Sequence, residues 1–321
     1  MKVFRRLPPP DARDPCALTI GNFDGVHRGH QALLSALLAD ARAVGLPSCV
    51  LTFEPHPREY FATLAQRAGA AAAAPVRIVN LRDKLEALAA LGIDRVCVAH
   101  FNPSLAAMTA ERFVTDYLAQ GLRARQLLIG DDFRFGARRT GDFALLQRIC
   151  PRVGISVSAI ATVREADHRI SSSLVREALA AADLDRVQDL LGRPYRLSGR
   201  VIHGRKLGRD LGFPTLNLRF PHGRPALTGI FVVRVTGIEG DRALPGVASF
   251  GTRPAIEADG RYLLEVHLLD WRGDAYGKLA RVEFLRKLRD ERAFPDLAEL
   301  TRAIAADVQA ARLHFHDPAL P

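Results

Sequence analysis

Two hydrophobic patterns follow one another along the chain. From about residue 15 to about residue 185, near-continuous apolar runs of strand length alternate with amphipathic segments of helix length. The expected strands are residues 17–20, 48–53, 95–99, 126–129 and 155–160, and the expected helices are residues 31–44, 81–91, 110–119, 142–149 and 173–181. Apolar strands alternating with helices are typical of a parallel sheet covered on both faces. This part therefore predicts an α/β domain.

After about residue 190 the strands become shorter and follow each other closely. The expected strands are residues 195–202, 230–235, 244–250, 262–269 and 280–285, separated by Gly, Pro and Asp turns. This spacing predicts an antiparallel β-barrel. A last amphipathic helix is expected at residues 296–313. We predict two domains, residues 1–183 and 184–321, and a mobile loop at residues 68–75, where the sequence is rich in alanine.

Composition limits the class of protein. A length of 321 residues suits two domains, and a hydrophobic content of 48% suffices for packed cores. We find no apolar run of about eighteen residues and no signal-peptide core at the N-terminus, so neither a membrane span nor secretion is expected. The four cysteines lack Cys-x-x-Cys spacing, and three lie in or beside apolar runs. We therefore expect reduced core cysteines and a cytoplasmic protein.

The net charge of +10 leaves a second class open. A basic surface suits nucleic acid or any polyphosphate. The arginines, however, are scattered along the chain, and no basic stripe with interleaved aromatic residues occurs. We favour the interpretation that this protein does not bind nucleic acid.

The first motif lies directly after the first expected strand. It reads Gly-Asn-Phe-Asp-Gly-Val-His-Arg-Gly-His at residues 21–30, just before an expected helix that begins near His30. Glycines allow the backbone to approach a ligand, and the amino end of a helix holds phosphate. His27 and His30 can donate hydrogen bonds to phosphate oxygens. A metal pair is the alternative, but no further ligand follows at metal spacing. A chance pair on a solvated helix start is the other alternative.

Two further segments of the first domain carry candidate ligand-binding groups. Residues 169–176 read Arg-Ile-Ser-Ser-Ser-Leu-Val-Arg at an expected helix start. Serines there are first of all N-caps, yet their hydroxyl groups and Arg176 can also converge on a phosphate. Residues 130–136 read Gly-Asp-Asp-Phe-Arg-Phe-Gly and follow another strand, where an acidic turn is the simpler interpretation. No Gly-x-Gly-x-x-Gly fingerprint occurs, which disfavours a dehydrogenase.

The second domain has candidate residues of its own. Residues 204–217 read Gly-Arg-Lys-Leu-Gly-Arg-Asp-Leu-Gly-Phe-Pro-Thr-Leu-Asn and are not a P-loop, because Gly-Lys-Ser/Thr is missing. Thr215 and Asn217 offer hard oxygen ligands suited to Mg²⁺ that carries ATP phosphates. Glu265 lies in an otherwise apolar strand, as either an outward surface residue or a placed base.

These motifs, in this order, resemble those of bacterial bifunctional riboflavin kinase/FAD synthetases, and the first resembles the His-x-Gly-His signature of nucleotidylyltransferases. The resemblance implies a Rossmann-like nucleotidylyltransferase domain followed by a riboflavin kinase barrel. It departs from the family pattern at Ser173, Val175 and Leu216, and at Ser249, where relatives commonly have Asn. The last departure puts the geometry of its loop in doubt.

The resemblance also implies roles for individual residues. The catalytic residues would be His27, His30 and Glu265. The metal ligands would be Thr215 and Asn217. The flavin-binding residues would be Asp132, Phe133, Arg289 and Glu291. The residues that bind ATP or its phosphates would be Gly21, Asn22, Phe23, Asp24, Gly29, Arg169, Ser172, Ser173, Arg176, Gly204, Gly208 and Arg209.

The expected function is phosphorylation of riboflavin to FMN, followed by adenylylation of FMN to FAD with release of pyrophosphate. Expected partners are riboflavin, FMN, FAD and ATP with Mg²⁺, without nucleic acid or membrane, and a weak homo-oligomer is allowed. Two alternatives stay open. One is a single-function nucleotidylyltransferase with a regulatory second domain. The other is a basic nucleic-acid-binding protein that retains a nucleotide-binding fold.

Overall fold

The computed structural model describes residues 1–161, 164–165, 168–204, 208, 211–220, 224–252 and 262–316. The chain divides into two compact units. Unit 1 comprises Met1–Pro75 and Lys84–Ser171, and unit 2 comprises Val76–Asp83 and Ser172–Pro321. The predicted domain division after residue 183 falls between helices α7 (Ser172–Ala180) and α8 (Leu184–Leu191), both of which belong to unit 2.

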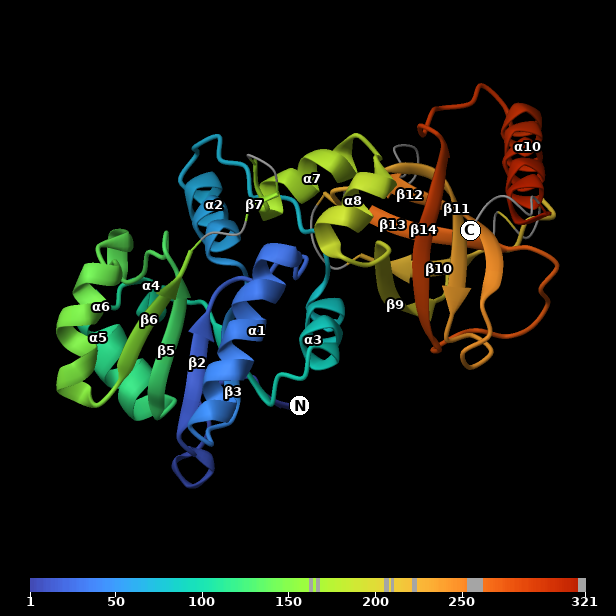
Figure 1. Ribbon diagram of the computed structural model, residues 1–321. Helices are drawn as coiled ribbons and strands as arrows, with labels where there is room; N and C mark the ends of the chain where they lie inside the picture. Colours follow the sequence, from blue (N-terminus) through green and yellow to red (C-terminus); the bar gives the residue numbers. More distant parts are fainter. Residues whose placement is uncertain are drawn as a thin grey trace. The chain divides into compact units, whose positions relative to one another are not determined.

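Unit 1 contains the predicted parallel sheet (Figure 1). Its six strands have the order β1-β4-β3-β2-β5-β6, and every neighbouring pair is parallel. The bounds are β1 (Lys2–Phe4), β2 (Cys16–Ile20), β3 (Ser48–Glu54), β4 (Arg95–His100), β5 (Ala124–Gly130) and β6 (Ser156–Ile160). Every residue of β2, including Thr19, is buried, which explains why its sequence is mostly apolar. The short edge strand β1 was not predicted, because three residues show no readable period.

Helices cover both faces of this sheet, as predicted (Figure 1). One face packs against α5 (Ala110–Arg112), the π-helix η2 (Phe113–Gly121) and α6 (Phe143–Ile149), while α1 (Arg28–Ala43) contacts β2, β3 and β5. The other helices are α2 (Pro57–Arg67), α3 (Leu81–Ala90) and α4 (Pro103–Ala106). Prolines in the segment obscured α2, which His56 caps at its first turn together with Glu59.

Unit 2 is the predicted antiparallel barrel with a last helix beside it (Figure 1). The closed strand order is β10-β13-β12-β11-β14-β9. The bounds are β9 (Arg196–Ile202), β10 (Leu216–Arg219), β11 (Gly229–Thr236), β12 (Leu244–Thr252), β13 (Tyr262–Leu268), β14 (Leu279–Arg289) and α10 (Leu297–His316). Apolar residues of β11 and β12 pack against Ala311 of α10. Strand β10 was not predicted, because its four residues lie within and just after a motif interpreted as a loop.

Unit 2 also includes a short segment from the first half of the sequence. The Tyr195 hydroxyl group donates a hydrogen bond of 2.8 Å to the carbonyl oxygen of Ile78. The Asn80 side chain donates to the carbonyl oxygen of Ser198 at 2.8 Å. These buried or half-buried bonds tie residues 76–83 to the first strand of the barrel. Unit 2 therefore consists of two separate stretches of the sequence.

The cysteines are core residues, as the sequence indicated. All four are free thiols and all are buried. Burial raises the pKa of the Cys97 thiol to about 12 and that of Cys150 to about 11, so both stay protonated near neutral pH. Within the described residues, no helix is long and apolar enough to cross a membrane.

Candidate functional site

The first candidate site is the turn between β2 and α1. Helix α1 begins at Arg28, two residues earlier than expected, because His27 is its N-cap. The backbone N–H of His30 donates to Nδ1 of His27 at 3.3 Å. A neutral His27 ring then carries its proton on Nε2. The two imidazole rings stack with their centroids 3.7 Å apart. The fold thus brings both predicted histidines together at a helix start.

The backbone of this turn has an unusual conformation. Phe23 and Val26 have positive φ angles of 48° and 45°. Such strain costs about 1–3 kcal/mol per residue and persists only where the surroundings enforce it. Here Phe23, Val26, Asp24 and His27 are all buried. The shape of the turn is therefore fixed by packing, which suits a preformed binding site.

Asn22 presents an acceptor at the same turn. Its Oδ1 atom is buried and has no hydrogen-bond partner among the described residues. The hydroxyl group of Thr52 donates to its backbone carbonyl oxygen at 3.2 Å, which anchors the residue to β3. A buried oxygen without a partner is costly. It is therefore a position where a bound ligand can supply a donor.

The turn lies beside the start of the serine motif. A Cβ atom on Gly29 would lie 3.1 Å from the carbonyl oxygen of Ile170 and 3.2 Å from the His27 ring. The chain just before Ser171 therefore approaches α1 closely, and a larger residue at position 29 would have to displace its neighbours slightly. Within unit 1, the structure thus joins the two motifs at Ile170.

The remaining members of the serine motif belong to unit 2. Ser172, Ser173 and Arg176 lie in α7, and Nε of Arg176 donates to the carbonyl oxygen of Val76 at 2.7 Å. The side chain of Arg169 lies outside the described residues. Whether these groups converge with His27 and His30 on one triphosphate therefore stays a prediction.

The loop after β5 lies at the same sheet edge as the histidine turn. Strands β2 and β5 are parallel neighbours, so both lead into loops at the carboxyl edge. Asp132 is exposed, and Phe133 stacks on Phe135 with ring centroids 5.5 Å apart. The two predicted flavin contacts of unit 1 therefore lie in the loop after β5, at the same sheet edge as the predicted phosphate site.

An aromatic group that the sequence analysis missed lies at the carboxyl ends of β3 and β4. Phe53, Tyr60, Phe61 and Phe101 contact one another edge to face, with centroids 5.3–5.9 Å apart. The Phe61 side chain is 51% exposed. The sequence did contain a signal for this group, because Phe53 and Phe101 lie near the carboxyl ends of β3 and β4. Helix α2, which supplies Tyr60 and Phe61, was not predicted. This group places a partly exposed aromatic cluster at the sheet edge where ligands of such folds bind.

The second candidate site is a row of polar residues across three barrel strands. Glu265 of β13 lies opposite Asn217 of β10 and opposite Ser249 of β12. Cross-strand partners share one face of a sheet. The next residues, Leu264 and Val266, are buried, so the row lies on the outer face of the barrel. Register alone aligns the predicted base with a predicted metal ligand.

The Asn217 amide fits a metal site. It is 5% exposed, and its Oδ1 atom has no hydrogen-bond partner among the described residues. Its Nδ2 donates to the carbonyl oxygen of Thr215 at 3.3 Å, which turns the amide oxygen the other way. Gly204 lies against this amide so closely that a Cβ there would overlap it. An amide oxygen is a ligand that hard divalent cations accept.

The rest of the loop is described only in part. Gly208 accepts a hydrogen bond of 2.6 Å from the backbone N–H of Phe213, which closes the loop just before Thr215. Arg209 lies outside the described residues, so its predicted contact with ATP has no structural account.

Glu291 reaches the row from the segment after β14. Its Oε1 accepts a hydrogen bond of 2.9 Å from the Ser249 hydroxyl group, and its carboxylate lies against Gly251. Burial raises the pKa of Glu291, and the charge of Glu265 raises it further, while Ser249 and Arg289 act in the opposite direction. The position where relatives commonly have Asn thus holds a second carboxyl group near Glu265.

Arg289 contacts the last helix of unit 2. Its guanidinium group forms a bidentate ion pair with Asp307 of α10. Nη2 lies 2.7 Å from Oδ2, and Nε lies 3.0 Å from Oδ1. Asp307 is buried. The described contacts of Arg289 therefore hold α10 against the barrel, and its contact with flavin stays a prediction.

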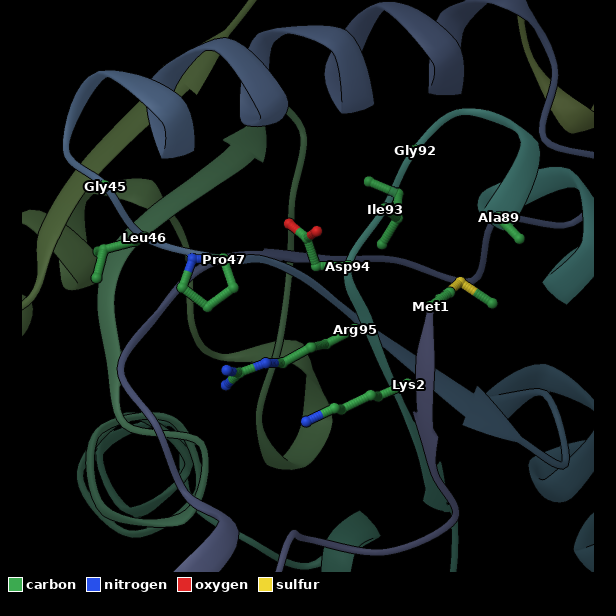
Figure 2. A pocket seen from close by; sticks show the side chains of 10 residues that line it. All are labelled: Met1, Lys2, Gly45, Leu46, Pro47, Ala89, Gly92, Ile93, Asp94 and Arg95. Atoms are coloured by element: carbon green, nitrogen blue, oxygen red, sulfur yellow. The ribbon is translucent and has the colours of Figure 1, made fainter.

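A cavity of about 660 Å³ lies at the amino ends of the strands of unit 1, at the sheet edge opposite the histidine turn (Figure 2). It is lined in part by Lys2, by Pro47 before β3, and by Asp94 and Arg95 at the start of β4. Arg95 pairs with Asp14 at 2.9 Å, and Asp94 accepts from Ser48. No predicted site residue lines it. The described residues also contain no cluster of three or more His, Cys, Asp or Glu suited to a metal.

The two units define a nucleotide-binding α/β unit joined to a small closed barrel, each with polar groups prepared for phosphate or metal. The FAD synthetase family profile matches residues 10–174, and the riboflavin kinase profile matches residues 191–315. A bifunctional riboflavin kinase/FMN adenylyltransferase of Pseudomonas fluorescens is 48% identical over 297 residues. The alignment covers 92% of each chain. The Escherichia coli K12 protein of the same description is 46% identical over 303 residues, with 94% of each chain covered.

A solved structure has the same two-unit fold. A crystal structure described as a macrolide-efflux protein from Streptococcus pneumoniae matches 97% of this chain and 98% of its own, with a TM-score of 0.74 and 26% identity. Together with the relatives, these matches show that the chain belongs to the family of bifunctional riboflavin kinase/FMN adenylyltransferases. The predicted family and fold are thus confirmed. The second domain has the fold of riboflavin kinases.

Proposed function

We propose that unit 2 phosphorylates riboflavin to FMN and that unit 1 joins FMN to AMP from a second ATP, releasing pyrophosphate. The relatives named above carry both activities in their descriptions, and they align over nearly the whole chain. The observation that carries the proposal is that each of the two family regions contains its own group of candidate site residues. Four reduced cysteines and these substrates favour the cytoplasm.

In unit 1, the first turn is proposed to hold the triphosphate of ATP. The N–H groups at the start of α1 and the rings of His27 and His30 stabilise the charge that builds up on the transferred and leaving phosphates. Gly21, Asn22, Phe23, Asp24 and Gly29 shape the turn. The enzyme contributes positioning and charge neutralisation, without a covalent intermediate.

In unit 2, Glu265 is proposed to take the proton from the ribityl hydroxyl group as its oxygen attacks the γ-phosphate of ATP. Enzymes of these families use ATP with a divalent metal. We propose Mg²⁺, held by Thr215 and Asn217, which neutralises phosphate charge when bound. The amide oxygen of Asn217, which has no hydrogen-bond partner in the described part of the chain and lies opposite Glu265, supports this assignment.

The flavin ring in unit 1 has two aromatic surfaces available, one on each side of β2. The predicted surface is Phe133 beside Asp132, and the second is the group around Phe61. Rings that stack on flavin quench its fluorescence, so FMN titrations of the Phe61→Ala and Phe133→Ala variants would separate them. The surface that holds FMN for adenylyl transfer is the one whose loss also raises the KM for FMN.

One experiment tests the two activities directly. The purified chain is incubated with riboflavin, ATP and Mg²⁺, and the flavins are separated by chromatography over time. FMN should appear first and FAD should follow. A parallel incubation with FMN should give FAD without delay. Absence of FMN in the first incubation would refute the kinase assignment, and absence of FAD in the second would refute the adenylyl transfer.

The metal assignment needs its own experiment. Removal of Mg²⁺ with a chelator should abolish both reactions. Asn217→Ala should shift the Mg²⁺ concentration for half-maximal FMN formation upward, so that added metal partly restores activity. The same variant should convert FMN to FAD with an unchanged Mg²⁺ requirement. An unshifted Mg²⁺ curve for FMN formation would exclude Asn217 as a ligand.

A further inference from the structure

A small closed loop follows Phe133 at the carboxyl edge of unit 1. The backbone groups of Phe135 and Gly141 pair in both directions, at 3.1 and 2.9 Å. A Cβ on Gly136 or Gly141 would come within 2.9 Å of Ala110, a buried residue. The loop of residues 135–141 is therefore packed at its base against α5, and this packing restricts its backbone conformation. Gly136 also has a φ of 72°, which a larger residue would strain.

Two consecutive arginines form the tip of this loop in a strained backbone conformation. Arg138 and Arg139 have φ angles of 54° and 59°. The N–H of Arg139 donates to the carbonyl oxygen of Gly136 at 3.0 Å, and the N–H of Ala137 donates to that of Met108 at 2.8 Å. The conformation would cost glycine or asparagine less. Both side chains are exposed, so packing does not require arginine here. Strain of this kind tends to occur at ligand sites.

The two guanidinium groups also lack acidic partners. Within the described part of the chain, neither Arg138 nor Arg139 has a side-chain hydrogen bond or ion pair. By contrast, Arg134 of the same loop pairs with Asp142 at 3.2 Å. Asp131 and Asp132 precede the tip and have interactions of their own. The loop therefore presents two positive charges that nothing in the described fold neutralises.

The place of these charges indicates their ligand. The loop follows β5, the neighbour of β2, so its base lies at the same sheet edge as the histidine turn. Adenylyl transfer brings two anions to this edge. A phosphate oxygen of FMN attacks the α-phosphorus of ATP, the new P–O–P bond forms, and the bond to the β-phosphate oxygen breaks as pyrophosphate leaves. The proposed function assigns the histidine turn to ATP and no cationic side chain to the phosphate of FMN.

We infer that Arg138 and Arg139 bind the 5′-phosphate of FMN and thereby select FMN over riboflavin as the acceptor. The inference rests on the proposed assignment of adenylyl transfer to unit 1. Guanidinium groups pair with phosphate through two parallel hydrogen bonds, which fixes orientation as well as charge. A rigid loop with a strained tip holds these groups in place before the substrate arrives.

The test uses the full chain with both arginines replaced by glutamine. In FAD formation from FMN, the KM for FMN should rise about tenfold to a hundredfold, the range for lost hydrogen bonds to a charged group. The KM for ATP and the rate of FMN formation from riboflavin should stay unchanged. Arg152→Gln, which removes an exposed arginine elsewhere in unit 1, is the matched control and should leave all three values unchanged.

A second pair of variants separates charge from loop shape. Arg138→Gly with Arg139→Gly should preserve the positive φ angles with less strain, and should nevertheless raise the KM for FMN as much as the glutamine pair. Arg138→Lys with Arg139→Lys should restore part of the affinity. An unchanged KM for FMN in the glycine pair would overturn the inference, as would a rise confined to the KM for ATP. The rate at which the wild-type protein converts FMN to FAD tests the assignment of adenylyl transfer to unit 1, independently of the two arginines.

Discussion

In unit 1, the candidate site is a turn at the edge of a parallel sheet, whereas in unit 2 it is a row of side chains across an antiparallel barrel. Backbone conformation shapes the first, through the positive φ angles of Phe23 and Val26 and the N-cap at His27. Strand register shapes the second, because it places Asn217, Glu265 and Ser249 side by side.

This difference predicts which substitutions should disrupt each site. A turn held by packing is sensitive to changes in its buried side chains, its backbone and its cap, so a substitution there can alter shape as well as chemistry. A row set by register keeps its backbone when one side chain changes, so a substitution removes one chemical group and little else. Single substitutions in the barrel should therefore give the cleanest losses of activity.

The largest effect is expected for Glu265→Gln. Glutamine keeps the size of the side chain but cannot accept the hydroxyl proton, so FMN formation should fall about 10²–10⁴-fold. Conversion of supplied FMN to FAD should stay at the wild-type rate. Glu299→Gln, on the exposed face of α10, serves as the control and should change neither reaction. FMN formation at the wild-type rate in Glu265→Gln would show that Glu265 is only a surface residue.

A loss confined to the other reaction is expected when an imidazole is removed from unit 1. His30→Ala should slow FAD formation about 10²–10³-fold while FMN still accumulates, the effect of losing a hydrogen bond to transition-state phosphate. His27→Asn should do the same with little loss of stability, because asparagine is also a good N-cap. His100→Ala, at the exposed end of β4, is the control. Wild-type FAD output from a folded His30→Ala protein would refute the role.

A smaller effect, on stability, is expected for Tyr195→Phe. The change leaves the buried carbonyl oxygen of Ile78 without its partner and should destabilise unit 2 by about 1–2 kcal/mol. Trp271 is the single tryptophan and lies in unit 2, so its fluorescence during urea unfolding follows that unit. Tyr117→Phe in unit 1 should leave that transition in place. An unshifted transition in Tyr195→Phe would mean that the hydrogen bond between Tyr195 and Ile78 does not stabilise unit 2.

The smallest effect concerns the pH dependence of stability through Glu291. Its pKa in the folded protein lies above the ordinary 4.5, so the folded state binds this proton more tightly than the unfolded state. The resulting stabilisation is complete below about pH 4.5 and is lost as the pH rises through the folded pKa. Relative to Glu291→Gln, the wild type should therefore lose stability as the pH rises above about 4.5 and through the raised folded pKa.

The carboxyl group of Glu265 sharpens this last prediction. Because its negative charge raises the pKa of Glu291, Glu265→Gln should lower that pKa and shrink the pH-dependent difference. The carboxyl carbon signal of Glu291, followed by NMR against pH, measures the shift directly. A pKa of Glu291 that does not move in Glu265→Gln would mean that the two groups do not interact, which would contradict the row as described.

Much of this protein was determined by local sequence alone. Mostly apolar runs such as 17–20 and 48–53 form the buried strands, because a strand buried on both faces has few polar positions. The histidine turn and the Thr215–Asn217 loop were recognisable because their chemistry depends on a few residues close together in sequence. These local features sufficed to predict both folds and the family.

Tertiary structure decided what depends on residues far apart in the sequence. Register brought Ser249 and Glu265 opposite each other, and chain reversal brought Glu291 to them from 42 residues beyond Ser249. Packing against Ala110 fixed the loop that carries Arg138 and Arg139, and hydrogen bonds to Tyr195 and Ser198 drew residues 76–83 into unit 2. No local pattern encodes such pairings, because each forms only when distant segments meet and their polar groups must find partners away from water.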